Sequence, residues 1–519
     1  MSAAAVARSA AVVLLSAAAG FGGAAGVSAT LDGGAAPAGA AIAAAPAPAQ
    51  PARPRNVVII LSDDHRYDFL GFMPRAPRWL RTPGLDRMRA EGAHVRNAFV
   101  TTSLCSPSRA SILTGQYAHR HGVVDNSSPI PPGTTFFPQY LQRAGWRTAY
   151  IGKWHMGEDA GSDQPRPGFD HWISFRGQGS YTDPTLNVNG RSTALTGYTT
   201  DILTDSAVAW LARQPAGDGG RPFFMVLAHK ATHAEFVPAP RHAGQYADSA
   251  IPYPPTMANT ESNYQGKPRW VREQRNSWHG VDYAYHGDLR FDDFYRAYGE
   301  TLLALDESVG RVLDELRRSG LDRSTLVLYM SDNGFVLGEH GLIDKRHAYE
   351  ESIRIPMLAW APGLVAPGST VEANVRNIDV APTVLELAGV RPPERHALDG
   401  RSVLAALRGG GTAAARQASG EGEFLYEYYW EYAFPHTPTT FALRGDRFKY
   451  VYYHGVWDVN ELYDLRTDSL EQSNLVNVPF YRDTVAAMRR RLFDRLEATG
   501  GMQVPIRRGD WQAAERRNP

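Results

Sequence analysis

Short apolar runs of strand length recur along this chain and alternate with helical patterns. The first is "NVVIILS" at 56–62, and similar runs lie at 147–152, 222–229, 324–331 and 353–361. Continuous apolar runs of this length are typical of strands that are covered on both faces. Helical patterns fill the intervals, at 83–92, 108–117, 136–145, 200–214 and 294–320. This alternation predicts an α/β fold with a mostly parallel central sheet flanked by helices.

The N-terminal residues have a different character. Arg8 precedes an apolar run rich in Ala and Gly, and "VSAT" follows it, so residues 1–29 are expected to be a secretory signal peptide cleaved near Ala29. Residues 30–54 are mostly Ala, Pro and Gly, a composition that predicts a disordered linker. We therefore expect an exported protein, periplasmic or secreted, with no stable membrane insertion after cleavage. The alternative is an uncleaved anchor.

The C-terminal part of the chain follows a low-complexity joint at 407–420. Short strand patterns lie beyond it at 422–432, 439–445, 448–455 and 460–468, followed by a helical pattern at 485–498. These predict a smaller C-terminal antiparallel-sheet subdomain over 416–519, after a catalytic domain over 55–415.

Charge and cysteine content narrow the function. Lys+Arg and Asp+Glu are balanced at 54 each, which argues against a nucleic-acid partner, because such binders carry a basic excess. Cys105 is the only cysteine, so no internal disulfide can form. It is either a small buried residue or a reactive group.

Carboxylates follow two of the predicted strands. Asp63 and Asp64 end the first, and Asp332 and Asn333 end the strand at 324–331. Functional sites of parallel sheets lie at the carboxyl ends of strands, so these side chains should meet. Adjacent buried carboxylates repel one another unless a cation lies between them, and an all-oxygen set suits calcium or magnesium. For the Asp63–Asp64 pair alone, a turn or helix cap would be the simpler interpretation.

A set of motifs identifies a family resemblance. "CSPSRASILTG", at 105–115, resembles the Cys-x-Pro-x-Arg signature of the sulfatase family. Six further motifs follow in the family's order: "GKWHMG", "HKATHAEF", "SDNGFVLGEHG", "DKRHAYEESIRIP", "NIDVAPTVLELAG" and "ELYDLRTDSLEQSNL". The resemblance extends from residue 56 to about residue 477, and so many motifs in register leave little room for coincidence.

The resemblance implies a role for Cys105. In this family a formylglycine-generating enzyme reads the linear motif, including Pro107 and Arg109, and oxidises the cysteine to Cα-formylglycine. The aldehyde hydrate carries two oxygens, one to attack sulfur and one to expel the sulfate afterwards. The resemblance therefore favours a reactive Cys105 over a small buried residue without a chemical role.

The resemblance also assigns the remaining roles. Asp63, Asp64, Asp332 and Asn333, with the oxygen on residue 105, would hold one Ca²⁺, Mg²⁺ being the less favoured ion. Arg109 would hold the hydrate, Lys153 the sulfate, and His155 would act as base on the diol. His233 and Lys345 would serve the leaving group. The dication and three cationic side chains outweigh three carboxylates, which suits an anionic transition state.

Two stretches resemble one subgroup, the bacterial N-acetylglucosamine-6-sulfatases and mucin-desulfating sulfatases: "DDHRYDFLGFM" at 63–73, and residues 426–465. This implies a sulfated carbohydrate substrate, with 6-O-sulfate on N-acetylglucosamine of mucin or glycosaminoglycan. His436, between two predicted strands, would contact a sugar hydroxyl, helped by Arg376. The aromatic-rich segment 253–287 would be a cleft wall or plain packing.

Three alternatives remain at this point. One is another glycan or arylsulfatase-like specificity. Another is a formylglycine-dependent phosphonate or phosphate monoester hydrolase, although such relatives tend to have "SDHG" where this chain has "SDNG". The last is a catalytically silent glycan-binding protein, which the retention of every catalytic position disfavours.

Overall fold

The computed structural model describes residues 55–157, 163–216, 220–282, 290–409 and 422–505. These residues all belong to one compact unit. The predicted signal peptide, the linker at 30–54 and the boundary between residues 415 and 416 lie outside the described residues. The division into a catalytic domain and a subdomain therefore stays a prediction.

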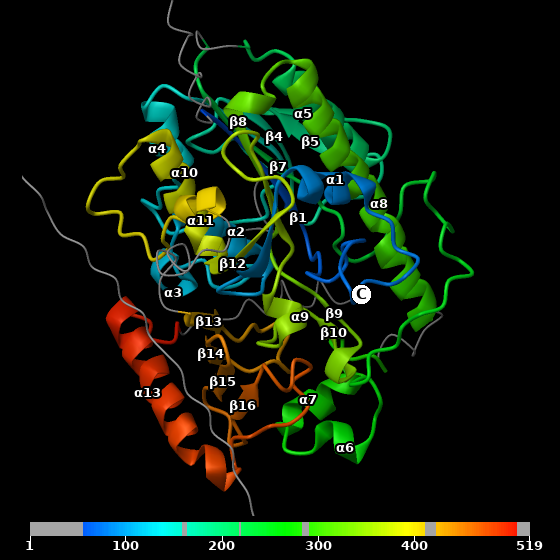
Figure 1. The fold of residues 1–519 in the computed structure, drawn as a ribbon, viewed down its shortest axis with the longest axis vertical. Coiled ribbons are helices and arrows are strands. Elements are labelled where there is room, and N and C mark those ends of the chain that lie inside the picture. The colour runs from blue at the N-terminus through cyan, green and yellow to red at the C-terminus, as the bar shows by residue number, and fades with distance from the viewer. Residues whose placement is uncertain (1–54, 158–162, 217–219, 283–289, 410–421, 506–519) are drawn as a thin grey trace, which may run out of the picture. The chain divides into compact units, whose positions relative to one another are not determined.

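A ten-stranded sheet, several strands of which are labelled in Figure 1, organises the unit. Its strand order is β12-β2-β11-β8-β1-β7-β3-β4-β5-β6. Its strands are β1 (Asn56–Ser62), β2 (Ala93–Phe99), β3 (Arg147–Lys153), β4 (His171–Phe175), β5 (Thr185–Val188), β6 (Arg191–Ala194), β7 (Phe223–Ala228), β8 (Thr325–Ser331), β11 (Met357–Trp360) and β12 (Ser369–Arg376). Only β11 and β5 run against the others in this sheet. The mostly parallel α/β fold expected from the sequence is thus confirmed.

Helices cover both faces of the sheet because its central strands are apolar on both sides. Along β1, Val57, Ile59 and Leu61 enter one core and Val58 and Ile60 the other. Three helices pack on the second core: α1 (Pro83–Glu91), α5 (Thr199–Leu211) and α8 (Phe291–Arg318). The first core receives α2 (Cys105–Thr114), α4 (Pro138–Arg143), α10 (Val380–Ala388) and α11 (Leu404–Gly409).

Some elements differ from the sequence expectation. The strand expected at 353–361 is shorter, because its first residue ends the short helix α9 (Glu350–Ile353), and β11 is antiparallel to β8. The strands β2, β4, β5, β6 and β12 were not foreseen, since they are short or carry polar residues among the apolar ones. The remaining short elements are α3 (Ala118–His121), α6 (Glu261–Tyr264), α7 (Arg269–Glu273), β9 (Val336–Leu337) and β10 (Ile343–Asp344).

A second, four-stranded antiparallel sheet forms the C-terminal part, as expected. Its order is β13 (Phe424–Tyr428), β14 (Thr440–Arg444), β15 (Phe448–Tyr453) and β16 (Glu461–Asp464), and α13 (Arg482–Thr499) packs against it. The sheet joins the first core directly, since the rings of Phe99 and Phe424 lie 5.0 Å apart. Trp270, from the aromatic-rich segment 253–287, packs on Tyr453 with ring centroids 5.4 Å apart, so this part of the segment serves packing.

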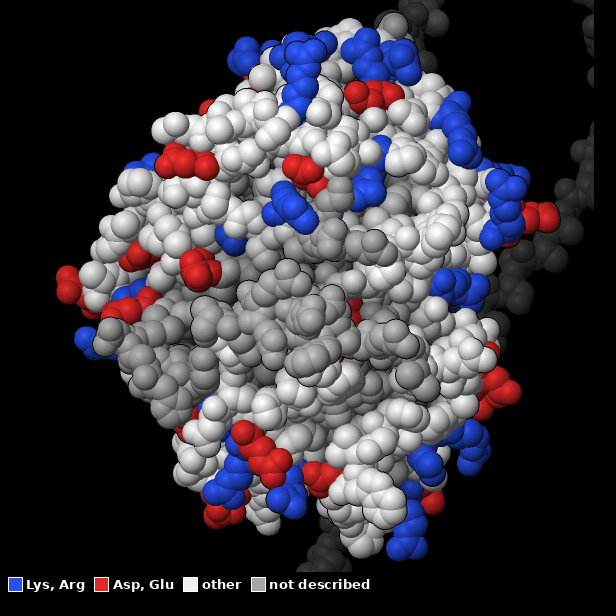
Figure 2. All heavy atoms as spheres, turned by 180° about the vertical axis from the view of Figure 1, so that it is seen from behind, with Lys and Arg blue, Asp and Glu red and all other residues white. Residues whose placement is uncertain are grey.

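The surface carries both signs of charge. On the face in Figure 2, Lys and Arg side chains are interspersed with Asp and Glu around the edge. None of the helices in the described ranges combines the length and apolar character required to cross a membrane.

Candidate active site

The carboxyl ends of β1 and β8 bring four predicted ligands together. The strands pair in parallel with Ser62 opposite Ser331, so the residues that follow lie side by side. The Asp64 backbone N–H donates to Asp332 Oδ1 (3.2 Å), and Asn333 Nδ2 donates to Asp64 Oδ1 (2.6 Å). Asp63 also lies in this group, and all four side chains are buried. We call Asp63, Asp64, Asp332 and Asn333 the site cluster.

The backbone at Asp64 is held in an unusual conformation. Its φ of 59° lies in the left-handed region, which is costly for a residue with a side chain. Neighbours stabilise this conformation: the Tyr298 hydroxyl donates to the Asp64 carbonyl (2.8 Å), and so does Thr232 Oγ1 (3.4 Å). The strain turns the Asp64 carboxylate toward Asn333 and Lys345.

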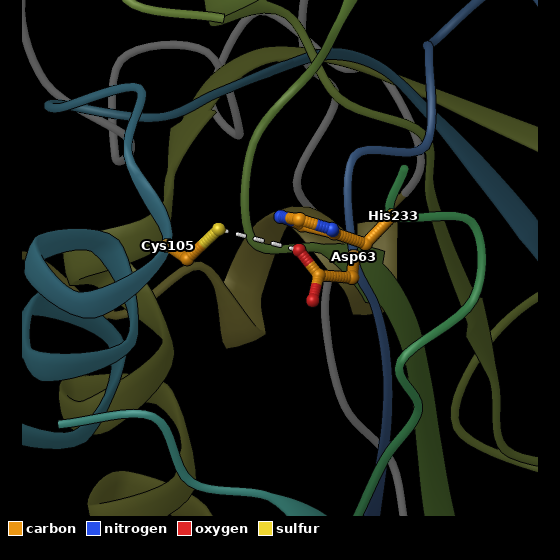
Figure 3. A group of neighbouring side chains, drawn as sticks. All are labelled: Asp63, Cys105 and His233. Atoms are coloured by element: carbon orange, nitrogen blue, oxygen red, sulfur yellow. Dashed lines mark hydrogen bonds between the residues drawn. The ribbon is translucent and has the colours of Figure 1, made fainter. Parts of the chain in front are cut away.

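Cys105 is the first residue of α2, and its side chain points into the same site (Figure 3). Sγ lies 3.3 Å from Asp63 Oδ1, and the His233 ring lies close to both. Two serines of α2 fix its position: Ser106 Oγ donates to the carbonyl of His155, and Ser108 Oγ to that of Asp332. The positive end of the helix dipole therefore faces the site, which favours an anion there.

Three cations neutralise the carboxylates one by one. The Lys153 ammonium binds Asp63, Arg109 binds Asp332 through Nε and a terminal nitrogen (both 2.8 Å), and Lys345 Nζ binds both Asp64 oxygens (2.8 and 2.7 Å). Each of these side chains is buried. These three ion pairs balance one another in charge, so a bound dication would leave positive charge in excess, which favours an anion.

Burial and charge set the ionisation of these groups. Burial acts to raise the Asp63 pKa, but Lys153, His233 and Arg109 outweigh it and hold that pKa well below its usual range. Burial, with the charge of Asp63, raises the pKa of Asp332 to about 7. Burial, with Asp63, likewise raises the pKa of the Cys105 thiol, so an unmodified cysteine here is a poor nucleophile.

The two histidines of the site differ in exposure. His155 is buried, and its Nδ1 has no hydrogen-bond partner among the described residues. The His233 side chain is 15% exposed, its Nδ1 donates to the Ala234 carbonyl, and its Nε2 lies 3.9 Å from Asp64 Oδ2. Burial, and then nearby lysine charges, lower the pKa of both imidazoles well below the usual range. Both rings are neutral in the free site and able to accept protons.

Gly152 lets β3 deliver Lys153 and His155 to the site. Its φ is 117°, and a Cβ atom there would lie 1.8 Å from the carbonyl oxygen of Ala228 on β7. Any other residue would push the two strands apart. The glycine in "GKWHMG" is therefore required by this close approach.

The donor set fits a hard divalent cation. Ligand oxygens of Asp63, Asp64 and Asp332 lie within 4.8 Å of one another. Asn333 Oδ1 is buried and has no hydrogen-bond partner in the described part of the chain, so an acceptor remains for a cation. Carboxylate and amide oxygens are the ligands that calcium and magnesium prefer.

The two predicted sugar contacts occupy different surroundings. His436 is exposed on the loop after β13, and its carbonyl accepts from Gln274 Nε2 (2.8 Å), whose Oε1 lies 3.2 Å from His347 Nε2. The loop is thus tied to the segment that carries Lys345. The guanidinium of Arg376 is instead bound to Asp379 (3.0 and 2.7 Å), three residues along the chain.

Some residues of the site were not foreseen from the sequence. Gln178 Oε1 accepts from Lys153 Nζ (2.5 Å), and Asn377 Nδ2 donates to Ser108 Oγ (2.9 Å), which supports α2 from behind. Lys230 lies at the end of β7, between the strands that carry Asp63 and Lys153. Asn377 and Lys230 belong to the family motifs named above, so the sequence could have indicated them. Gln178 lies in a loop outside those motifs.

Comparison with known proteins agrees with this geometry. Residues 55–390 match the sulfatase family model, and residues 338–498 match the model for the C-terminal part of N-sulphoglucosamine sulphohydrolase. The N-acetylglucosamine-6-O-sulfatase of Bacteroides thetaiotaomicron is 33% identical over 86% of this chain and 86% of its own. The human N-acetylglucosamine-6-sulfatase is 30% identical over 72% of this chain and 67% of its own.

A solved structure gives the same result. The structure of BT4656 in complex with its substrate D-glucosamine-2-N,6-O-disulfate has a TM-score of 0.76 and 30% identity, covering 87% of this chain and 99% of that one. With family motifs, fold and sequence identity in agreement, the chain belongs to the sulfatase family and is a sulfuric ester hydrolase.

Proposed function

We propose that this sulfatase removes O-sulfate from a sulfated glycan, namely the 6-O-sulfate of N-acetylglucosamine units in mucin or glycosaminoglycan. The observation that carries the proposal is the 33% identity to an N-acetylglucosamine-6-O-sulfatase over 86% of both chains. The BT4656 complex supports it, because the sugar bound there is also a 6-O-sulfated glucosamine.

Cys105 would be converted to Cα-formylglycine by a formylglycine-generating enzyme before folding. Its position at the start of α2, beside Asp63 and His233, supports this assignment. The hydrated aldehyde would supply one oxygen to attack sulfur and a second to release the sulfate. The high thiol pKa is consistent with a residue that does not act as cysteine.

The other side chains divide into two groups. Arg109 and Lys153, both buried beside Asp63, would hold the hydrate and the sulfate. His155 would take a proton from the diol through a ring nitrogen. His233 and Lys345 would serve the leaving oxygen. Because His233 Nδ1 donates to a carbonyl, the neutral ring carries its proton there, and Nε2 would have to take up a second proton before giving it to the sugar alkoxide.

Ca²⁺ would be held by Asp63, Asp64, Asp332 and Asn333, with Mg²⁺ the less favoured ion. It would supply positive charge for the sulfate oxygens, which the three cations alone do not leave in excess. The free Asn333 Oδ1 supports the assignment.

His436 would contact a hydroxyl of the sugar. The loop that carries it is tied through Gln274 and His347 to the Lys345 segment, which supports a position beside the leaving group. The expected help from Arg376 would require its ion pair with Asp379 to open on binding.

A substrate panel tests the proposed function. Sulfate release is measured on N-acetylglucosamine 6-sulfate, its 3- and 4-sulfated isomers, galactose 6-sulfate, an aryl sulfate and a phosphonate monoester. We expect kcat/KM to be highest for the 6-sulfated glucosamine. A preference for the phosphonate would instead support a formylglycine-dependent phosphonate monoester hydrolase, which the asparagine at position 333 disfavours.

Peptide mass spectrometry tests the modification. In protein coexpressed with a formylglycine-generating enzyme, residue 105 should appear as the aldehyde or its hydrate. Cys105→Ala should abolish turnover, and Cys105→Ser should allow at best one slow transfer. A thiol that persists at residue 105 in active enzyme would refute the assignment.

Export is proposed from residues 1–29 alone. Sequencing of the mature N-terminus from the periplasm or medium should find a start near residue 30, after which the protein would be periplasmic or secreted. A full-length N-terminus in the membrane fraction would favour the uncleaved anchor.

A further inference from the structure

Lys230 is a positively charged residue of the site to which none of the roles above has been assigned. It lies two residues beyond the end of β7, and β7 lies between β1, which delivers Asp63, and β3, which ends in Lys153. The residue is only 6% exposed. Its ammonium nitrogen lies 4.8 Å from the centroid of the Tyr181 ring and makes a cation–π contact with this ring.

The ammonium of Lys230 has no anionic partner. Each of the other four lysines of the chain bonds another side chain: Lys153 binds Asp63, Lys267 binds His340, Lys345 binds Asp64 and Lys449 binds Glu471. Within the described part of the chain, the Lys230 side chain makes neither a hydrogen bond nor an ion pair, although its backbone carbonyl accepts from the His233 N–H (2.9 Å). A nearly buried charge without a partner is costly, so its retention calls for a ligand that supplies one.

The contacts of Lys230 link it to His233, the residue proposed to protonate the leaving oxygen of the sugar. The Tyr181 hydroxyl donates to the His233 carbonyl (2.5 Å), so the aromatic ring under Lys230 is joined to the loop that carries the proposed acid. Lys230 and His233 stand three residues apart on this loop. Burial, and then the charge of Lys153, lower the pKa of Lys230 to about 8, so the ammonium remains charged at neutral pH.

We propose that Lys230 binds a second anionic group on the sugar, a sulfate other than the one that is hydrolysed. This rests on the proposed function, since it assumes a glucosamine 6-sulfate in the site. The hydrolysed sulfate already has Lys153, Arg109 and the α2 N-terminus, so a further cation on the His233 loop is available for another substituent. A sulfate on the 2-amino group of the same ring is an anion of this class.

Binding measurements separate this proposal from general electrostatics. Cys105→Ala protein, which cannot turn over, is titrated calorimetrically with D-glucosamine 6-O-sulfate and with D-glucosamine-2-N,6-O-disulfate. Adding Lys230→Met should weaken binding of the disulfate by roughly ten- to a hundredfold and leave the monosulfate within about threefold, the effect of one charge-assisted hydrogen bond. Lys230→Arg, which keeps the charge, should restore most of the loss.

Controls keep the result interpretable. Arg191→Gln removes an exposed cation from β6 and should change neither affinity. The melting temperature of Lys230→Met should equal or exceed that of the parent, because an unpaired buried charge is removed. That of Lys230→Arg should at least equal it, because the charge is kept. Equal losses on both sugars, or no loss on either, would overturn the proposal.

The proposed function can fail separately. If enzyme without substitutions, shown to carry formylglycine at residue 105, releases no sulfate from either sugar but the disulfate still binds through Lys230, the hydrolytic assignment is wrong and the subsite stands. If neither sugar binds to the Cys105→Ala protein, both are wrong.

Discussion

Two buried acidic clusters lie in this molecule, and they differ in what balances them. The site cluster ends β1 and β8. The second, which we call the junction cluster, consists of Glu350, Glu351, Glu461 and Glu471, where α9 meets the C-terminal sheet. Both contain groups of side chains with metal-ligand spacing, the junction cluster through His340, Glu351 and Glu471. Spacing alone therefore does not distinguish a metal site from a structural one.

The junction cluster is filled by the protein's own donors. Hydroxyls of Tyr349, Tyr453 and Tyr463 donate to Glu461 at 2.8–3.0 Å. Lys449 binds Glu350 and Glu471. The ammonium of Lys267 donates to His340 Nδ1 (2.8 Å), so a protein cation stands where an ion would have to bind.

The site cluster is arranged for an incoming group instead. Asp64 is held in a strained backbone conformation, Asn333 Oδ1 has no partner among the described residues, and the His233 side chain remains partly exposed. The site cluster thus combines strain, a free acceptor and access, whereas Glu350, Glu461 and Glu471 of the junction cluster are bound by side chains of the protein itself.

The largest expected effect is on the site cluster. Asp332→Ala removes a carboxylate ligand and the partner of Arg109, so calcium affinity should collapse and kcat/KM should fall by about 10³-fold or more. Elemental analysis and sulfate-release kinetics measure the two. The fold should survive, with a melting temperature below that of the exposed-site control Asp248→Ala, because the buried Arg109 keeps only the more distant Asp63 (3.5 Å). Full activity of unmutated protein in excess chelator, with no metal found, would remove the metal from the proposal.

The second prediction concerns the junction cluster, where a substitution should lower stability and leave the metal content unchanged. Glu461→Ala leaves three buried tyrosine hydroxyls without their acceptor, so we expect a loss of about 3 kcal/mol in the free energy of unfolding with metal content unchanged. Chemical denaturation measures it. Glu461→Gln keeps an acceptor oxygen and should lose less. Loss of bound metal in Glu461→Ala at unchanged stability would make the junction cluster the ion site.

The third prediction concerns the loop that joins the two regions. His436→Ala should lower kcat/KM on the glycan substrate by roughly ten- to a hundredfold, because a buried sugar hydroxyl loses its partner. An aryl sulfate has no such hydroxyl, and its hydrolysis should change little. Equal losses on both substrates would assign His436 to the structural side of the comparison, and no loss on either would exclude it from the site.

The smallest effect, counted per pH unit, is a pH dependence of the junction cluster. Burial, with the charge of Glu339, raises the Glu351 pKa from 4.5 to about 8. The folded state then holds a proton that the unfolded state has released, so stability is full below about pH 4.5 and declines as pH rises toward 8. The slope from this residue is at most about 1.4 kcal/mol per pH unit. Melting temperatures across pH 5–8 should fall less in Glu351→Gln, and parallel curves would refute the assignment.

The α/β class and the candidate site could be predicted from the sequence more completely than the individual helices and strands could. Long apolar runs such as 56–62 and 324–331 need no tertiary information, because strands buried on both faces are apolar throughout. Edge strands such as β6, with the sequence "RSTA", have no such pattern. Their pairing depends on neighbours distant in sequence, which is why they were missed.

By itself, the sequence determined which side chains follow β1 and β8, and that Cys105 lies in a sulfatase motif just before a helical pattern, since these features depend on local order along the chain. That the helix begins at Cys105 itself was decided by the fold. Only the tertiary structure decided that Arg376 is paired with Asp379, that Lys230 has no anionic partner among the described residues, and that Glu471 near His340 is already neutralised by Lys449. The physical reason is that the energy of a buried charge depends on the groups around it in space. Those groups come from strands and loops far apart in the chain.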